Sequence, residues 1–155
     1  QAGCAAGSGP LGPGGLGKLI QRYRSTEAGI QGHVLLAQVH FEKGEFQQGI
    51  AELKPVTDAK DAYTAAAAMN LMAAGQEQSG KFTDAAATYQ KAAAKAPYKV
   101  EHDVYMASAA RALTTAGKLD DAKKIWSALA KDDESAASAE ARGRRGESGA
   151  KGVQG

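Results

Sequence analysis

Residues 72–97 read MAAGQEQSGKFTDAAATYQKAAAKAP, and this stretch decides the fold. Ala73 is followed by Gly80 and then by Phe82, after which small residues recur up to Pro97. A glycine just past a helix end takes a positive φ at no steric cost, and a proline cannot donate the next backbone hydrogen bond. The stretch therefore predicts two helices joined by a short turn at Gly80.

The same pattern occurs three times along the chain. The turn glycines are Gly44, Gly80 and Gly117, so the copies are spaced by 36 and 37 residues. Each copy has a small residue in its first helix and another twelve positions later, which lets two antiparallel helices approach closely. Neighbouring hairpins then bury what one hairpin alone cannot. The repeat positions of this pattern are Ala37, Gly44, Gly49, Ala73, Gly80, Ala85, Tyr89, Pro97, Ala110, Gly117, Ala122 and Trp126.

Helical periodicity extends this pattern over most of the chain, and no strand is expected. The four consecutive alanines over 65–68 are assigned to a helix, because alanine has the highest helix propensity. The predicted helices cover residues 28–43, 46–58, 61–79, 82–95, 100–116 and 119–131, with a weaker one over 134–142.

The arrangement resembles the tetratricopeptide repeat family, whose loose signature residues 30–134 carry. The resemblance implies an all-α fold, a right-handed α-solenoid of antiparallel helix hairpins. The run Glu140-Ala141-Arg142, with Arg144, Gly146 and Glu147, is similar to the closing helix of bacterial envelope members such as the ancillary subunit of the Sec translocon. The implied units are a partial repeat over 18–27, repeats over about 30–60, 61–98 and 100–134, and a terminal helix over 134–142.

Composition separates the two ends from the middle. Of the 155 residues, 34 are alanine and 19 are glycine, and seven of the glycines lie in residues 1–17 and five in residues 143–155. We therefore expect a flexible glycine-rich segment over 1–17 and a disordered basic tail over 143–155. Aromatic residues make up only 6% of the chain, too few for a layered sandwich or barrel.

The net charge of +2 belongs to the tails, because residues 25–141 hold 12 basic and 16 acidic groups. An acidic body repels nucleic acid, so we expect no nucleic-acid partner.

The sequence contains no pattern typical of an enzyme. His33 and His40 lie seven residues apart, but no further ligand stands at a spacing that would complete a metal site. His102 is next to Asp103, and we interpret Asp103 or its neighbours as residues of a helix start, where acidic groups meet exposed backbone N–H groups. We therefore predict a non-enzymatic chain with no cofactor, no metal and no small-molecule substrate.

The resemblance implies that the first helix of each hairpin lines a concave face. We predict that the chain is a scaffold or adaptor that binds a peptide or helix of another protein there, with Phe41 as the apolar contact. The alternative is a structural or assembly subunit bound permanently within a larger envelope complex. The predicted partner-binding residues are Gln38, Phe41, Glu42, Asn70, Glu77, Gln78 and Arg111.

Location is inferred from the resemblance alone, which implies the periplasmic side of a bacterial envelope, with the cytoplasm as the alternative. No apolar stretch approaches the roughly 18 residues needed to span a bilayer. The chain begins at Gln1 rather than at methionine, so a membrane anchor could belong to a segment that precedes it. Cys4 is either free or acylated, since its surroundings are similar to a lipoprotein junction.

Overall fold

The computed structural model describes residue 18 and residues 26–150, with side chains up to Arg144. The segment 1–17, most of the partial repeat over 18–27, and residues 151–155 lie outside the described residues. Every regular element in the described part is a helix, as expected from the sequence. The helices are α2 (Glu27–Glu42), α3 (Phe46–Thr57), α4 (Ala62–Gln78), α5 (Phe82–Lys95), α6 (Lys99–Thr115), α7 (Leu119–Lys131) and α8 (Ser138–Ala150).

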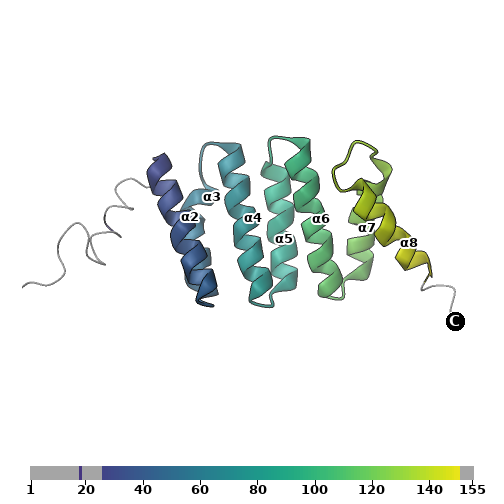
Figure 1. Ribbon diagram of the computed structural model, residues 1–155, viewed down its shortest axis with the longest axis horizontal. Helices are drawn as coiled ribbons and strands as arrows, with labels where there is room; N and C mark the ends of the chain where they lie inside the picture. Colours follow the sequence, from purple (N-terminus) through teal and green to yellow (C-terminus); the bar gives the residue numbers. More distant parts are fainter. Residues whose placement is uncertain (1–17, 19–25, 151–155) are drawn as a thin grey trace, which may run out of the picture.

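The helices stand side by side in chain order, from α2 at one end to α8 at the other (Figure 1). Each helix packs mainly against the helices before and after it in the sequence. The hairpins α2–α3, α4–α5 and α6–α7 follow one another in this way, an arrangement compatible with an α-solenoid. The bounds of α2 to α7 agree with the six helices predicted between residues 28 and 131 to within one residue.

The three predicted turn glycines close the first helix of each hairpin in the same way. Gly44, Gly80 and Gly117 have φ values of 75°, 79° and 77°. The N–H of Gly44 donates to the carbonyl of Phe41 at 3.0 Å, and the N–H of Glu45 donates to that of His40 at 2.8 Å. This pair of bonds defines the Schellman motif, and both bonds recur around Gly80 and Gly117. The predicted turn mechanism is confirmed.

Small residues form much of the core. Ala37, Ala73, Ala85 and Ala110 are all 0% exposed. A Cβ added to Gly49 would lie 2.9 Å from the backbone oxygen of Ala37, so that α2 and α3 are in close backbone contact there. The larger repeat residues Tyr89 and Trp126 are buried among the alanines of α5, α6 and α7, and α5 ends at Lys95, just before Pro97.

The last helix differs from the prediction. It begins at Ser138 rather than near residue 134, and it continues to Ala150, into the segment for which the sequence predicts a disordered tail. The delayed start has a local cause, because side-chain hydrogen bonds organise the preceding residues as turns. The N–H of Glu134 donates to Asp132 Oδ1 at 3.0 Å, and the N–H of Ala137 donates to Ser135 Oγ at 3.2 Å.

Candidate functional site: an apolar pocket on the first-helix face

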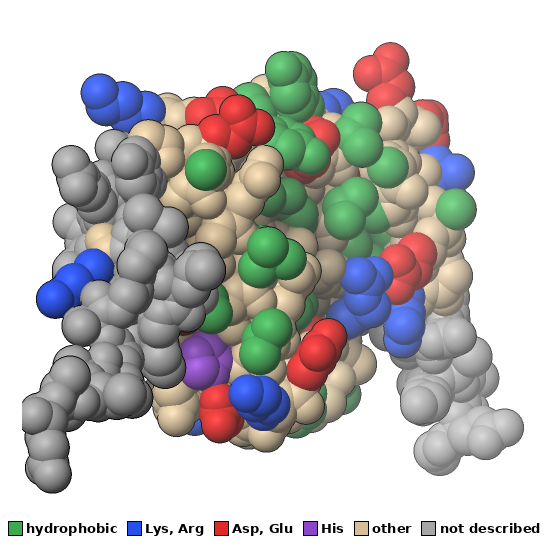
Figure 2. Space-filling model, turned by 60° about the vertical axis from the view of Figure 1, so that its left-hand side comes forward, with side chains coloured by type: hydrophobic (Ala, Val, Ile, Leu, Met, Phe, Trp, Pro, Cys, Tyr) green, Lys and Arg blue, Asp and Glu red, His purple; other side chains and the backbone are tan. Residues whose placement is uncertain are grey.

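The exposed sides of α2, α4 and α6, here called the first-helix face, carry most of the surface features that could recognise a partner. Figure 2 shows this side of the molecule, with hydrophobic side chains gathered over its middle. Tyr63 of α4 is 50% exposed, and Val100 and Val104 of α6 are 61% and 43% exposed. Exposed hydrophobic side chains that cluster in this way are typical of surfaces that bind other proteins.

An apolar pocket of about 300 Å³ opens between α2, α3 and α4. Val34 lies on the α2 side and Val56 on the α3 side, and the remaining lining comes from α4. A volume of this order suits one large apolar side chain and little more. The lining residues are Val34, Val56, Tyr63, Thr64, Ala67, Ala68 and Leu71.

The repeat pattern explains why the pocket is open. The turn glycines of the second and third copies are 37 residues apart, so Ala68 of α4 corresponds to Tyr105 of α6. Tyr105 is 8% exposed and packs with Ala66, Ala92 and Ala93. The tyrosine ring fills the space between successive hairpins in the third copy, whereas the second copy has only a methyl group at this position. The pocket is therefore a consequence of an alanine in place of a tyrosine.

Six of the seven predicted partner-binding residues are exposed or half-buried, and the seventh, Phe41, is buried. Gln38, Glu42 and Gln78 are exposed, as a binding role requires. Asn70, Glu77 and Arg111 are half-buried, and two of them are already held within the protein. Glu77 accepts a hydrogen bond from the Tyr89 hydroxyl at 2.9 Å. Arg111 donates to Glu140 Oε2 at 2.8 Å and to Ser108 Oγ at 2.9 Å.

Phe41 does not lie on the surface, contrary to the sequence prediction of an apolar partner contact. It is 8% exposed, and its ring lies between the glycine backbones of α3 and α4. Cβ atoms added to Gly49 or to Gly75 would each lie 2.4 Å from the ring. The missing side chains at these two positions make room for the phenylalanine, so Phe41 is a core residue and not a binding residue.

Two buried tyrosines, Tyr105 and Tyr89, have raised pKa values. Burial raises the pKa of Tyr105, and the nearby Tyr63 and Glu101 add to the effect. Burial also raises the pKa of Tyr89, together with the hydrogen bond to the Glu77 carboxylate. Both hydroxyls therefore stay protonated near neutral pH, and the Tyr89 hydroxyl donates its proton to the hydrogen bond with Glu77.

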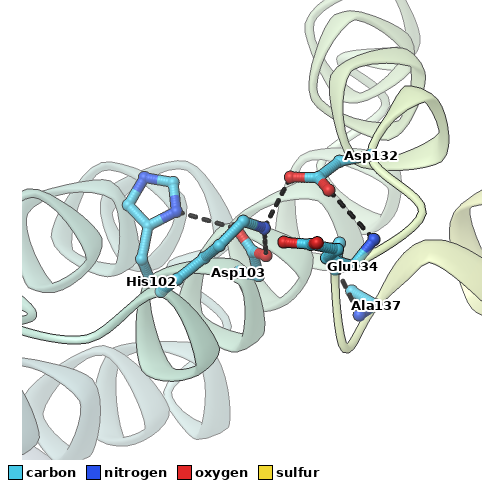
Figure 3. A network of polar contacts seen from close by, with 7 residues as sticks. His102, Asp103, Asp132, Glu134 and Ala137 are labelled. Atoms are coloured by element: carbon cyan, nitrogen blue, oxygen red, sulfur yellow. Dashed lines mark hydrogen bonds and ion pairs between the residues drawn. The ribbon is translucent and has the colours of Figure 1, made fainter.

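A second cluster of polar groups joins the start of α6 to the turn between α7 and α8 (Figure 3). The ammonium group of Lys99 lies 2.7 Å from Asp103 Oδ2 and 2.5 Å from Asp132 Oδ2. His102 Nδ1 lies 2.9 Å from the other oxygen of Asp103. Burial opposes ionisation of Asp103, but hydrogen bonds from Lys99, His102 and Ser135 outweigh it and lower the pKa of the carboxyl group.

This polar cluster resembles a catalytic arrangement only in its residue types. Asp103 is 5% exposed, and its carboxylate already accepts several hydrogen bonds within the protein. The structure thus gives Asp103 the role of fastening the α7–α8 turn to α6. The acidic residue in the first turn of α6 is Glu101, a neighbour of Asp103, and the N-cap residue Tyr98 makes no side-chain capping hydrogen bond.

The remaining histidines pair with carboxylates. His33 Nδ1 lies 2.9 Å from Glu52, and His40 Nδ1 lies 2.6 Å from Glu45. Within residues 26–144, no three His, Cys, Asp or Glu side chains gather as a metal site would require. None of the helices in the described part of the chain is both long and apolar enough to cross a membrane.

In the comparisons with known proteins, no family model, no curated protein and no solved structure matches the chain.

Proposed function

We propose that the chain is a non-enzymatic protein-interaction scaffold that binds a peptide or helix of a partner on the first-helix face. The single observation that carries the proposal is the apolar pocket between α2, α3 and α4, beside the exposed ring of Tyr63. One large side chain of a partner would fill the pocket, while the amides of Gln38 and Asn70 would supply hydrogen bonds around it.

We further propose that the hairpins form a right-handed superhelix of the tetratricopeptide type. Three Schellman turns at spacings of 36 and 37 residues support this, as do the paired small residues within each hairpin. In such a superhelix the first-helix face is concave, and an extended or helical partner would lie across several repeats.

The test is to fill the pocket with the residue that the next repeat already uses. The variant Ala68→Tyr places a ring at the position equivalent to Tyr105, and Ala87→Tyr on the exposed side of α5 is the matched control. Peptides displayed on phage would be selected against the unmodified full chain and then titrated against each variant.

We expect Ala68→Tyr to weaken binding of the selected peptides by at least about tenfold, because a filled pocket cannot receive an anchor side chain. Ala87→Tyr should leave the affinity unchanged. If circular dichroism shows that Ala68→Tyr does not fold, Tyr63→Ser removes an exposed ring of the same pocket and serves instead. Equal affinity for both variants, or no enriched peptide at all, would contradict the proposal.

One observation favours the alternative of a subunit held permanently in a larger assembly. Leu35 and Val39 of α2 are 62% and 43% exposed. By the repeat spacing, Val39 corresponds to Gly75 and Ala112, which are both buried within the array. The mass of the purified chain in solution separates the two functions, since a monomer that binds peptides supports the scaffold and obligate association supports the subunit.

A further inference from the structure

Charge is distributed unevenly between the first and second helices of the hairpins. The first helices α2, α4 and α6 together carry five acidic and two basic side chains, whereas α3, α5 and α7 carry four acidic and six basic ones. The two basic groups of the first helices are Lys99 and Arg111, and both are paired with carboxylates. The first-helix face therefore has acidic groups in excess and no unpaired lysine or arginine from α2, α4 or α6.

The asymmetry is strongest on α2 and α4. The flanking helices α2 and α4 contain Glu27, Glu42 and Glu77 and no lysine or arginine. His33 and His40 of α2 already lie against carboxylates of their own hairpin. A cationic segment that approaches α2 and α4 would thus meet attractive charge and no fixed positive charge on these helices.

Glu101 supplies an independent observation that points to a ligand. Its Oε2 atom is buried and has no hydrogen-bond partner among the described residues. Glu101 lies one helical turn before Tyr105, which packs against Ala66 of α4, so this oxygen stands at the junction of α4 and α6, one repeat along from the pocket. By the repeat spacing it occupies the position of Thr64, which lines the pocket itself. A buried carboxylate oxygen without a donor is costly, and a lysine or arginine from a partner would satisfy it.

We infer that the partner segment is cationic and amphipathic, with one large apolar side chain for the pocket and lysine or arginine on both sides of it. The inference rests on the proposed function of the first-helix face and adds the chemistry of its ligand. The apolar side chain supplies affinity by leaving water, and the flanking cations pair with the glutamates of the face and with Glu101 Oε2. An acidic segment would meet repulsion over the same surface.

The experiment uses the full chain and three labelled synthetic peptides of equal length. The first peptide has a leucine between lysines, the second replaces the lysines by glutamates, and the third keeps the lysines and replaces the leucine by serine. Fluorescence anisotropy at low and high ionic strength measures each affinity. Two variants of the chain accompany the titrations: Glu101→Gln, which removes a negative charge from α6, and Asp84→Asn, which removes a negative charge from the exposed surface of α5.

The first peptide should bind at least about tenfold more tightly than either of the other two at low ionic strength, and salt should reduce this advantage over the glutamate peptide. Glu101→Gln should weaken the first peptide about fivefold, while Asp84→Asn leaves it unchanged.

The outcomes separate this inference from the proposed function. If the glutamate peptide binds as tightly as the lysine peptide and Ala68→Tyr weakens both, the cationic preference is wrong and the binding face stands. If the serine peptide binds as tightly as the leucine peptide, attraction is purely electrostatic, and both the anchor and the pocket's role are refuted. If none of the peptides binds, the inference and the proposed function fall together.

Discussion

The variant Gly75→Ala would place a methyl group where the ring of Phe41 already lies. An ideal Cβ at this position is 2.4 Å from Phe41 Cζ and 2.5 Å from Cε1, whereas ordinary van der Waals contact begins at 3.4 Å. The ring cannot move away cheaply, because its adjoining edge lies against Gly49, and it also stacks on Phe46 with a centroid distance of 6.4 Å. The added methyl group therefore has to push α2 and α4 apart.

The magnitude follows from two opposing effects. Replacing a glycine by alanine inside a helix stabilises it by about 0.5–1 kcal/mol. Overpacking a well-filled core costs about 1–3 kcal/mol. The free energy of unfolding of Gly75→Ala should therefore fall by about 1 kcal/mol, and by no more than about 2.5 kcal/mol, as the difference of these two effects. Urea denaturation followed by circular dichroism measures this difference.

Gly143→Ala is the matched control, because a Cβ added there meets no atom within 4 Å. This variant should gain about 0.5–1 kcal/mol from helix propensity alone. Phe41→Leu replaces the ring by a smaller side chain that leaves room for the added methyl group. The free energy of unfolding of the double variant Phe41→Leu/Gly75→Ala should therefore fall by less than the sum of the two single losses, by about 0.5 kcal/mol or more. If Gly75→Ala stabilises the chain as Gly143→Ala does, or if the two changes are additive, Phe41 does not pack against Gly75 and the assignment to the core is wrong.

Three further predictions concern single interactions. Tyr89→Phe removes the hydrogen bond to Glu77 and should cost about 1 kcal/mol in thermal unfolding, with no loss of helix content. Gly80→Ala forces a methyl-bearing residue to φ +79° and should cost about 1–2 kcal/mol in urea denaturation, although no atom lies near the added Cβ. Asp103→Asn should cost about 1–3 kcal/mol at neutral pH, because Lys99 keeps only one of its two carboxylates. The pKa of Asp103 in the folded state lies below the ordinary 3.8. Its contribution to the free energy of unfolding is therefore complete above pH 3.8 and is lost as the pH falls through the folded-state pKa. If stability depends on acid pH in the same way in Asp103→Asn and in the unmodified chain, this reasoning is contradicted.

The sequence predicts the hairpins well because their signals are local. A glycine after a run of helix-forming residues can end the helix with a positive φ, whatever the rest of the chain does. Gly44, Gly80 and Gly117 meet this condition, and their spacing makes three independent predictions support one another. The bounds of α2 to α7 follow from these turns and from Pro97, so they needed no knowledge of how one hairpin contacts the next.

Contacts between hairpins are harder to predict, and Phe41 shows why. Its position in α2 suggests an exposed apolar residue only if the neighbouring helices leave no room for the ring. The room comes from Gly49 in α3 and from Gly75 in α4. Gly75 lies 34 residues after Phe41 in the sequence. A glycine inside each of these helices is a detectable signal, because it lowers helix propensity without a local benefit. Such a glycine favours a close approach by some other group, but the sequence alone does not identify that group.

The pocket could have been inferred from the repeat alignment by asking where a large side chain is missing. Ala68 belongs to a run of four alanines, and their high helix propensity is sufficient to account for the run. The difference in size between Ala68 and Tyr105 is found only when the side-chain volumes of the repeats are compared position by position. An apolar pocket costs stability, because its lining lacks partner atoms on one side. A fold that maximised stability alone would place a ring at residue 68 as it does at residue 105. The exchange that opens the pocket thus gives up packing between α2 and α4 for a surface that a partner's side chain can complete. That loss of packing is the physical support for the proposal that recognition takes place there.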